Sequence, residues 1–143
     1  MLYTIGFSGH NAKDFFLKLR DNEVKLILDV RLFNVSQLSG FAKRDDLKFF
    51  LSELCTCEYK HILKLAPTKS LLDDYKANRI DWNEYEKQFY TLMKERDVAK
   101  KVSVKDLDNA CLLCSENTPD KCHRRLVAEY FQKEFPKLRI KHL

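Results

Sequence analysis

Short apolar runs that alternate with amphipathic stretches constrain the fold of this chain most. Residues 24–30 read VKLILDV and residues 110–114 read ACLLC. Near-continuous apolar runs of this length are typical of strands buried on both faces, which occur in parallel sheets covered by helices. Because helical patterns stand between the runs, the sequence predicts one α/β domain over 1–143, with a mainly parallel sheet of about five strands flanked by helices.

The other elements follow from cap residues and periodicity. Asn, Thr and Asp often begin helices, because their side chains accept hydrogen bonds from free backbone N–H groups, and Thr followed by Pro is a further start signal. The helices between 68 and 96 are expected to form a cap added to the sheet. Expected strands are Leu2–Phe7, Val24–Val30, Glu58–Leu63, Ala110–Cys114 and Leu138–Leu143, and expected helices follow Asn11, span Asp46–Leu54, follow Thr68 and Asp81, and run from Thr118 to about Glu134.

Composition excludes several classes of protein. The chain is 45% hydrophobic, which is too apolar for a disordered protein. No apolar run approaches the roughly 20 residues of a membrane-spanning helix, and the first ten residues, MLYTIGFSGH, lack the pattern of a signal peptide. We therefore expect a cytoplasmic protein without a membrane partner, whose five cysteines are thiols.

The positive charge is concentrated near the carboxyl end. The formal net charge is +5, and residues 121–143 hold seven Lys and Arg against two Asp and Glu. This segment is either a solvated basic helix or a surface for an anionic partner such as nucleic acid. Its basic residues are Lys121, Arg124, Arg125, Lys133, Lys137, Arg139 and Lys141.

Three polar segments follow expected strands. In open parallel sheets, ligands bind beyond the carboxyl ends of the strands. That rule directs attention to the segments Ser8–His10, Asp29–Lys43 and Cys114–Arg125.

The segment CLLCSENTPDKCHRR is the most informative. With a helix from Pro119, Cys122, His123 and Arg124 occupy its first turns, and His123 points inward. Free N–H groups there attract an anion and favour the Cys122 thiolate, while His123 suits an acid, a base or a thiolate partner. The alternative is a small core cysteine beside a hydrogen-bonded core histidine.

Asp29 and Arg31 are two residues apart at a strand end, so their side chains share a face. They form either an anchor for a polar ligand, with Arg31 holding an anion, or an ion pair, Asp29–Arg124 or Arg31–Glu116, that ties loops together.

No metal or cofactor is expected. The spacing Cys111-x2-Cys114-x7-Cys122-His123 invites a zinc site, but residues three apart on a strand face opposite sides, which disfavours a zinc knuckle at Cys111 and Cys114. A structural zinc protein therefore stays only as a third interpretation. Cys55, Cys57 and His61 match no standard spacing. The sequence has neither a P-loop nor a G-x-G-x-x-G motif.

Five motifs occur in a fixed order along the chain: TIGFS, LILDVR, SGFAK, LAPT and LLCSE-x2-P-x2-CHR-x2-VAE. In this order they resemble the bacterial and archaeal domain-of-unknown-function family 488 (DUF488), from Tyr3 to about His142. The resemblance implies a small α/β fold and a site, not a reaction. Many members have a histidine where this chain has Phe7, and a proline where it has Asn34. Its motif positions are Gly6, Ser8, Asp29, Arg31, Ser36, Gly40, Phe41, Lys43, Cys114, Glu116, Cys122, His123 and Arg124.

These observations favour a small cytosolic enzyme that acts on a phosphate-bearing or nucleic-acid-related substrate. The expected catalytic residues are Cys122, His123, Asp29 and Glu116, and the expected substrate-binding residues are Ser8, Arg31, Lys43, Cys114 and Arg124. The alternative is a non-catalytic module that binds nucleic acid or protein through the basic carboxyl-terminal face.

Overall fold

The computed structural model describes residues 1–35 and 40–143, so the motif position Ser36 lies outside the described residues. Within these described ranges, three short 3-10 turns accompany the main elements, at Gly40–Ala42, Leu63–Leu65 and Val104–Leu107. The main elements are β1 (Leu2–Gly6), α1 (Ala12–Asp21), β2 (Leu26–Asp29), α2 (Arg44–Cys55), β3 (Glu58–His61), α3 (Lys69–Lys76), α4 (Trp82–Glu95), α5 (Val98–Lys101), β4 (Ala110–Cys114), α6 (His123–Glu134) and β5 (Ile140–His142).

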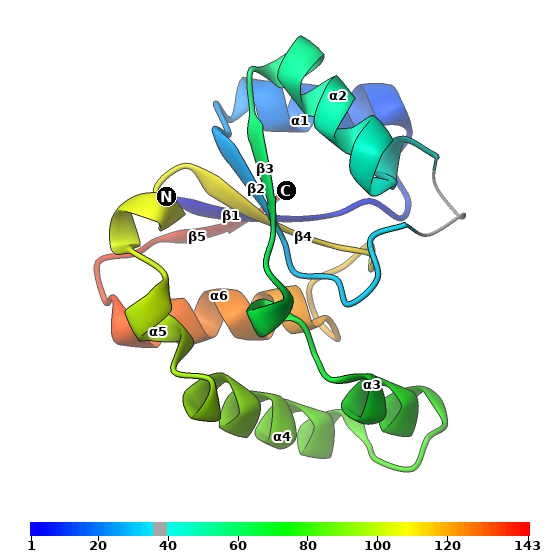
Figure 1. Ribbon diagram of the computed structural model, residues 1–143, viewed down its shortest axis with the longest axis vertical. Helices are drawn as coiled ribbons and strands as arrows, with labels where there is room; N and C mark the ends of the chain where they lie inside the picture. Colours follow the sequence, from blue (N-terminus) through cyan, green and yellow to red (C-terminus); the bar gives the residue numbers. More distant parts are fainter. Residues whose placement is uncertain (36–39) are drawn as a thin grey trace.

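The sheet confirms the predicted α/β fold. Its order is β3-β2-β4-β1-β5 and every pairing is parallel. Helices α1 and α2 cover one face, α6 covers the other, and α4 with α3 forms a further layer outside α6 (Figure 1). Among the described residues, no helix has the length and apolar character needed to cross a membrane.

Strand β4 lies at the centre of the sheet, as its sequence ACLLC suggests. All five of its residues are buried. Cys111 packs in the apolar cluster under α1 and α2, whereas Cys114 packs in the cluster under α6 and α4. The strand alternation therefore separates these two cysteines onto opposite faces, as predicted from their spacing.

Three expected helix caps are present. The Oδ1 of Asn11 accepts from Asp14 N at 2.8 Å, the Oγ1 of Thr68 accepts from Leu71 N at 3.1 Å, and the Oδ1 of Asp81 accepts from Glu84 N at 2.8 Å. Each bond satisfies one of the free N–H groups of a first helical turn.

The prediction of a helix from Thr118 is wrong at its start. Helix α6 begins at His123, and Cys122 is its extended N-cap residue, with φ −136° and ψ 134°. The loop before it is held in another shape, because the guanidinium of Arg124 binds the backbone carbonyls of Glu116 and Asn117. Those carbonyls are therefore not engaged in helical bonds.

Candidate functional site

Two neighbouring strands send their chains to opposite faces of the sheet. β1 and β4 pair side by side, but β1 continues to α1 on one face and β4 to α6 on the other (Figure 1). Such a divergence opens the crevice in which α/β proteins bind ligands. The diverging loops remain joined where they start, since Phe7 N donates to Cys114 O at 3.2 Å and Ser8 N donates to Ser115 O at 3.0 Å.

A pocket of about 410 Å³ lies at this crevice, between the strand ends and the α3–α4 layer. A larger hollow of about 510 Å³, beside Met1 and Pro136, holds none of the predicted site residues. The predicted residues that line the crevice pocket are Ser8, Arg31, Cys114, Glu116, Cys122 and His123.

The pocket has an aromatic wall and basic side chains that the sequence argument missed. Tyr75, Trp82 and Tyr85 line it from α3 and α4, and Lys76 and Lys121 add two positive charges. The Trp82 and Tyr85 rings are stacked with centroids 5.0 Å apart. The helical spacing of Trp82, Tyr85 and Phe89 in α4 can be read from the sequence, but nothing in it shows that one end of this aromatic row reaches the crevice.

Asp29 and Arg31 bind each other, and neither predicted pairing with Arg124 or Glu116 forms. Arg31 Nε donates to Asp29 Oδ1 at 2.9 Å, and Nη2 donates to Oδ2 at 2.6 Å. Asp29 is fully buried and Arg31 is 3% exposed. Burial alone would lower the pKa of Arg31, but the hydrogen bond and charge of Asp29 raise it overall. Arg31 therefore keeps its charge in this buried position.

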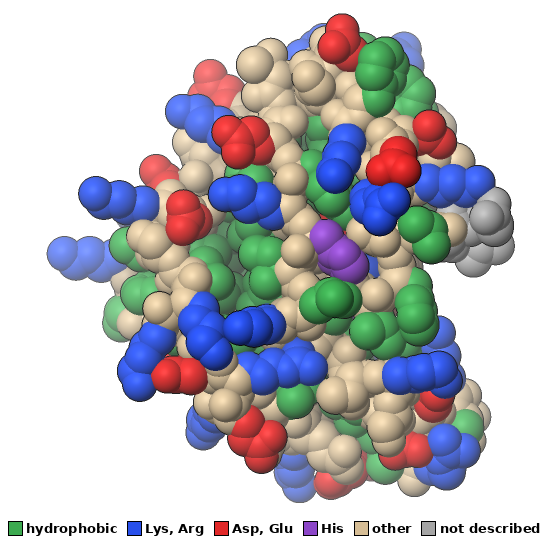
Figure 2. All heavy atoms as spheres, in the orientation of Figure 1, with side chains coloured by type: hydrophobic (Ala, Val, Ile, Leu, Met, Phe, Trp, Pro, Cys, Tyr) green, Lys and Arg blue, Asp and Glu red, His purple; other side chains and the backbone are tan. Residues whose placement is uncertain are grey.

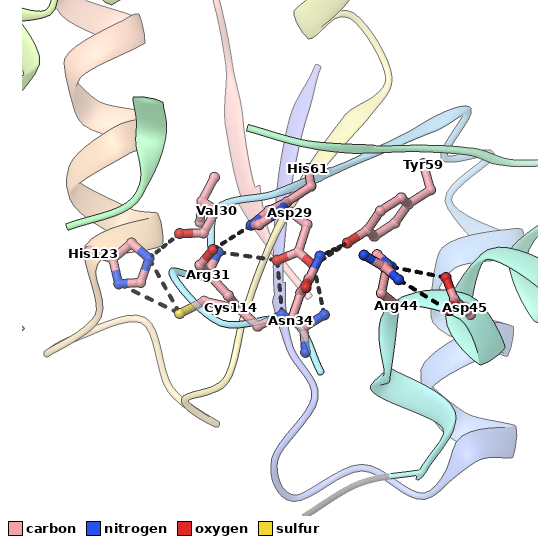
Figure 3. A network of polar contacts seen from close by, with 10 residues as sticks. All are labelled: Asp29, Val30, Arg31, Asn34, Arg44, Asp45, Tyr59, His61, Cys114 and His123. Carbon is pink, nitrogen blue, oxygen red and sulfur yellow. Dashed lines mark hydrogen bonds and ion pairs between the residues drawn. The ribbon is translucent and has the colours of Figure 1, made fainter. Parts of the chain in front are cut away.

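Other side chains complete the network around this pair (Figure 3). Tyr59 donates its hydroxyl to Asp29 Oδ2 at 2.6 Å and accepts from Asn34 Nδ2 at 3.0 Å. Burial first, and then the neighbouring carboxylate, raise the pKa of Tyr59. Among the described residues the Nη1 atom of Arg31 is buried without a partner, and the guanidinium lies over the Phe7 ring at 5.3 Å. Arg31 thus retains one nitrogen, with two N–H groups, that has no partner among the described residues.

The buried guanidinium of Arg124 binds other groups of the same chain. Arg124 is 1% exposed, and its Nη atoms donate to Glu116 O and to Asn117 O, the latter at 3.1 Å. Its Nη1 also lies 3.4 Å from Cys122 Sγ. Arg124 therefore shapes the loop that connects Cys114 to Cys122, and it does not line the pocket.

Cys114, Cys122 and His123 form a buried cluster on the pocket wall. Their sulfur and nitrogen atoms all lie within 4.8 Å of one another. Both ring nitrogens of His123 are 3.6 Å from Cys114 Sγ, and Nε2 lies 2.7 Å from Val30 O (Figure 3). Since a carbonyl only accepts, the ring donates its Nε2–H to Val30 O, which leaves Nδ1 beside the Cys114 sulfur. The expectation that His123 points inward is confirmed.

The two sulfurs differ in their ease of ionisation, in the opposite sense to the sequence argument. A hydrogen bond from Cys122, backbone N–H groups of Ser115 and Glu116, and the charge of Arg124 lower the pKa of Cys114 despite its burial. The bond to Cys114 and burial raise the pKa of Cys122. Cys114 is thus the better thiolate, because it receives the loop N–H groups as well as the Cys122 proton.

The remaining predicted residues lie at different depths. Asp29 is behind Arg31 and does not line the pocket, whereas Glu116 lines it and is exposed. Lys43 is the residue before α2 and is half-buried, outside the pocket lining. Lys43 is therefore not brought together with Arg31 and Arg124 at one anion site.

The fold and this pocket define a small parallel α/β protein with a cysteine–histidine cluster at the carboxyl ends of its central strands. The family model described as domain of unknown function DUF488 matches residues 11–131, so the chain belongs to that family. The searches of curated proteins and of solved structures give no match.

Proposed function

We propose that this protein is a small cytoplasmic enzyme whose substrate carries a phosphate and a planar ring, as a nucleotide does. The observation that carries the proposal is the crevice pocket, which combines the Trp82 and Tyr75 rings with the Lys76 and Lys121 amines. Rings of this kind stack on bases, and amines pair with phosphate oxygens. A phosphate oxygen that reached Arg31 beside Phe7 would also supply the acceptor that Nη1 lacks.

The groups suited to chemistry stand on the same wall. Cys114 has a lowered pKa, and the Nδ1 of His123 lies 3.6 Å from its sulfur. A thiolate and an imidazole in contact are a common reactive pair in enzymes. We therefore assign the reacting groups to the cluster of Cys114, Cys122 and His123, with Cys114 in place of Cys122 as the more reactive sulfur.

The basic carboxyl-terminal segment gives less support to the alternative of a binding module. Arg125 pairs with Glu86 and Glu129, and Lys133 lies over the Tyr90 ring at 4.5 Å. Basic and acidic side chains are interspersed on the face that Figure 2 shows. Positively charged side chains of this segment therefore interact with other side chains of the same chain.

The single tryptophan provides the test, because Trp82 lines the pocket. Nucleoside monophosphates are expected to quench its fluorescence on titration, and inorganic phosphate should compete with them. Lys121→Ala should weaken this binding about 10-fold or more, since a hydrogen bond to a charged group contributes about 1.5–3 kcal/mol. Lys105→Ala, an exposed lysine before β4 and outside the pocket, is the matched control.

Two results would count against the proposal. One is a Trp82 signal that no nucleotide changes. The other is binding of a single-stranded oligonucleotide that weakens steeply with salt yet ignores Lys121→Ala, which would favour the basic carboxyl-terminal surface instead.

A further inference from the structure

The cluster of Cys114, Cys122 and His123 has the dimensions of a metal site. Zinc bonds of 2.3 Å to sulfur and 2.0–2.1 Å to nitrogen place tetrahedral sulfur and nitrogen ligands about 3.6 Å apart and two sulfurs about 3.8 Å apart. The Cys114 sulfur is 3.6 Å from His123 Nδ1, and all three donor atoms fall within 4.8 Å. The three side chains are between 2% and 9% exposed, so they meet in a site largely shielded from water.

The atoms around the cluster orient it for a cation. Metal-binding histidines usually donate their other ring N–H to a carbonyl or carboxylate, and His123 donates Nε2–H to Val30 O at 2.7 Å. The Nη1 of Arg124, 3.4 Å from Cys122 Sγ, offsets negative charge on the second sulfur. These outer partners favour two thiolates and a neutral imidazole together.

The ligand set leaves room for a fourth partner. All three residues line the crevice pocket, which is also lined by Arg31 and Lys121. Two cysteines, one histidine and an open position make up one known arrangement of catalytic zinc, whereas structural zinc sites have four protein ligands. The sequence argument against zinc concerned a knuckle containing Cys111, which faces the other side of the sheet, and it does not apply to these three residues.

We propose that Cys114, Cys122 and His123 bind a thiophilic divalent cation, of which Zn²⁺ is the natural example, through Sγ, Sγ and Nδ1. Thiol ligands give up their protons when they bind a metal, so the cation is held by two thiolates and one neutral imidazole. The open position faces the pocket, where a substrate oxygen or a water occupies it. With the cation bound, the two thiolates and the imidazole serve as its ligands, so the reacting group of the proposed function becomes the oxygen at the open position. The metal site itself does not rest on the proposed function.

Cobalt provides the test, because Co²⁺ takes zinc sites and its spectrum reports its ligands. Wild-type protein is stripped with a chelator under a non-thiol reductant, checked for native circular dichroism, and titrated with Co²⁺ without oxygen. We expect one ion per chain, sulfur-to-cobalt charge transfer in the near ultraviolet and the visible bands of a tetrahedral ion, all removed by added Zn²⁺. An octahedral spectrum without charge transfer overturns the proposal, and this result requires no variant.

Matched cysteine variants locate the site. Cys114→Ser and Cys122→Ser should each weaken cobalt binding by more than about 100-fold, since loss of an outer partner alone costs about 10- to 100-fold. Cys111→Ser is the control, because Cys111 is equally buried on the same strand and faces away. Equal losses in Cys111→Ser and Cys114→Ser would contradict the assignment.

Each of the two proposals can be contradicted without contradicting the other. If the protein binds cobalt through sulfur but nucleotides leave Trp82 fluorescence unchanged, the proposed function alone is contradicted. Protein that binds nucleotides through Lys121 but gives no sulfur-to-cobalt band contradicts the metal site alone.

Discussion

Replacing Gly6 by alanine is expected to lower the free energy of unfolding by about 3 kcal/mol or more. A Cβ atom at this position would lie 1.6 Å from the carbonyl oxygen of Glu116 and 2.8 Å from Arg124 Nη1. The carbonyl cannot retreat freely, because Arg124 binds it and Ser8 N holds the same loop through Ser115 O. The effect is steric, since Gly6 is not among the positive-φ residues.

Thermal unfolding measures this effect, and for a chain of this size the melting temperature should fall by roughly 10 °C. Gly40→Ala is the control, because its added Cβ has no heavy atom within 4 Å among the described residues beyond its chain neighbours. That variant should melt within about 2 °C of wild type. A Gly6→Ala protein as stable as Gly40→Ala would show that the β1 and β4 loops do not approach each other as described.

The second large effect is expected from Arg31→Met, which should cost about 3–5 kcal/mol. It leaves the Asp29 carboxylate fully buried with Tyr59 as its remaining side-chain donor. Adding Asp29→Asn removes the charge that lacks a partner, so the double variant should be more stable than Arg31→Met alone. Urea unfolding of the wild type, both single variants and the double variant gives the coupling between the two residues.

An exposed ion pair in the same region provides the control (Figure 3). Arg44 also binds Asp45 through two hydrogen bonds, of 2.9 and 3.2 Å, but both side chains are exposed. Arg44→Met should therefore leave stability almost unchanged, because water screens and solvates an exposed pair. If Arg31→Met and Arg44→Met were equally mild, the buried position of the Asp29–Arg31 pair would be contradicted.

The elements could be predicted because their signals are local. The run ACLLC coincides with β4, and Asn11, Thr68 and Asp81 cap the helices that they were expected to begin. In each case a few neighbouring residues contain the whole physical reason, namely burial of an apolar run or satisfaction of a free N–H group.

The site was predicted less completely, because its interactions join distant segments. Arg124 was expected to hold an anion, but it binds two carbonyls of its own loop, and that contact depends on the shape of the loop. Cys122 was favoured for its nearness to a helix start, whereas Cys114 gains the N–H groups that ease its ionisation. Composition and spacing do not reveal which of two sulfurs receives such donors.

The central position of β4 has a consequence for how the chain reaches its fold. β4 pairs with both β1 and β2, yet it begins at residue 110, so two early strands lack their shared neighbour until most of the chain has been synthesised. Contacts between residues so far apart in sequence make folding slow and leave strand edges exposed meanwhile. On the ribosome the sheet is therefore completed late, and a chain interrupted before β4 contains neither a joined sheet nor a pocket.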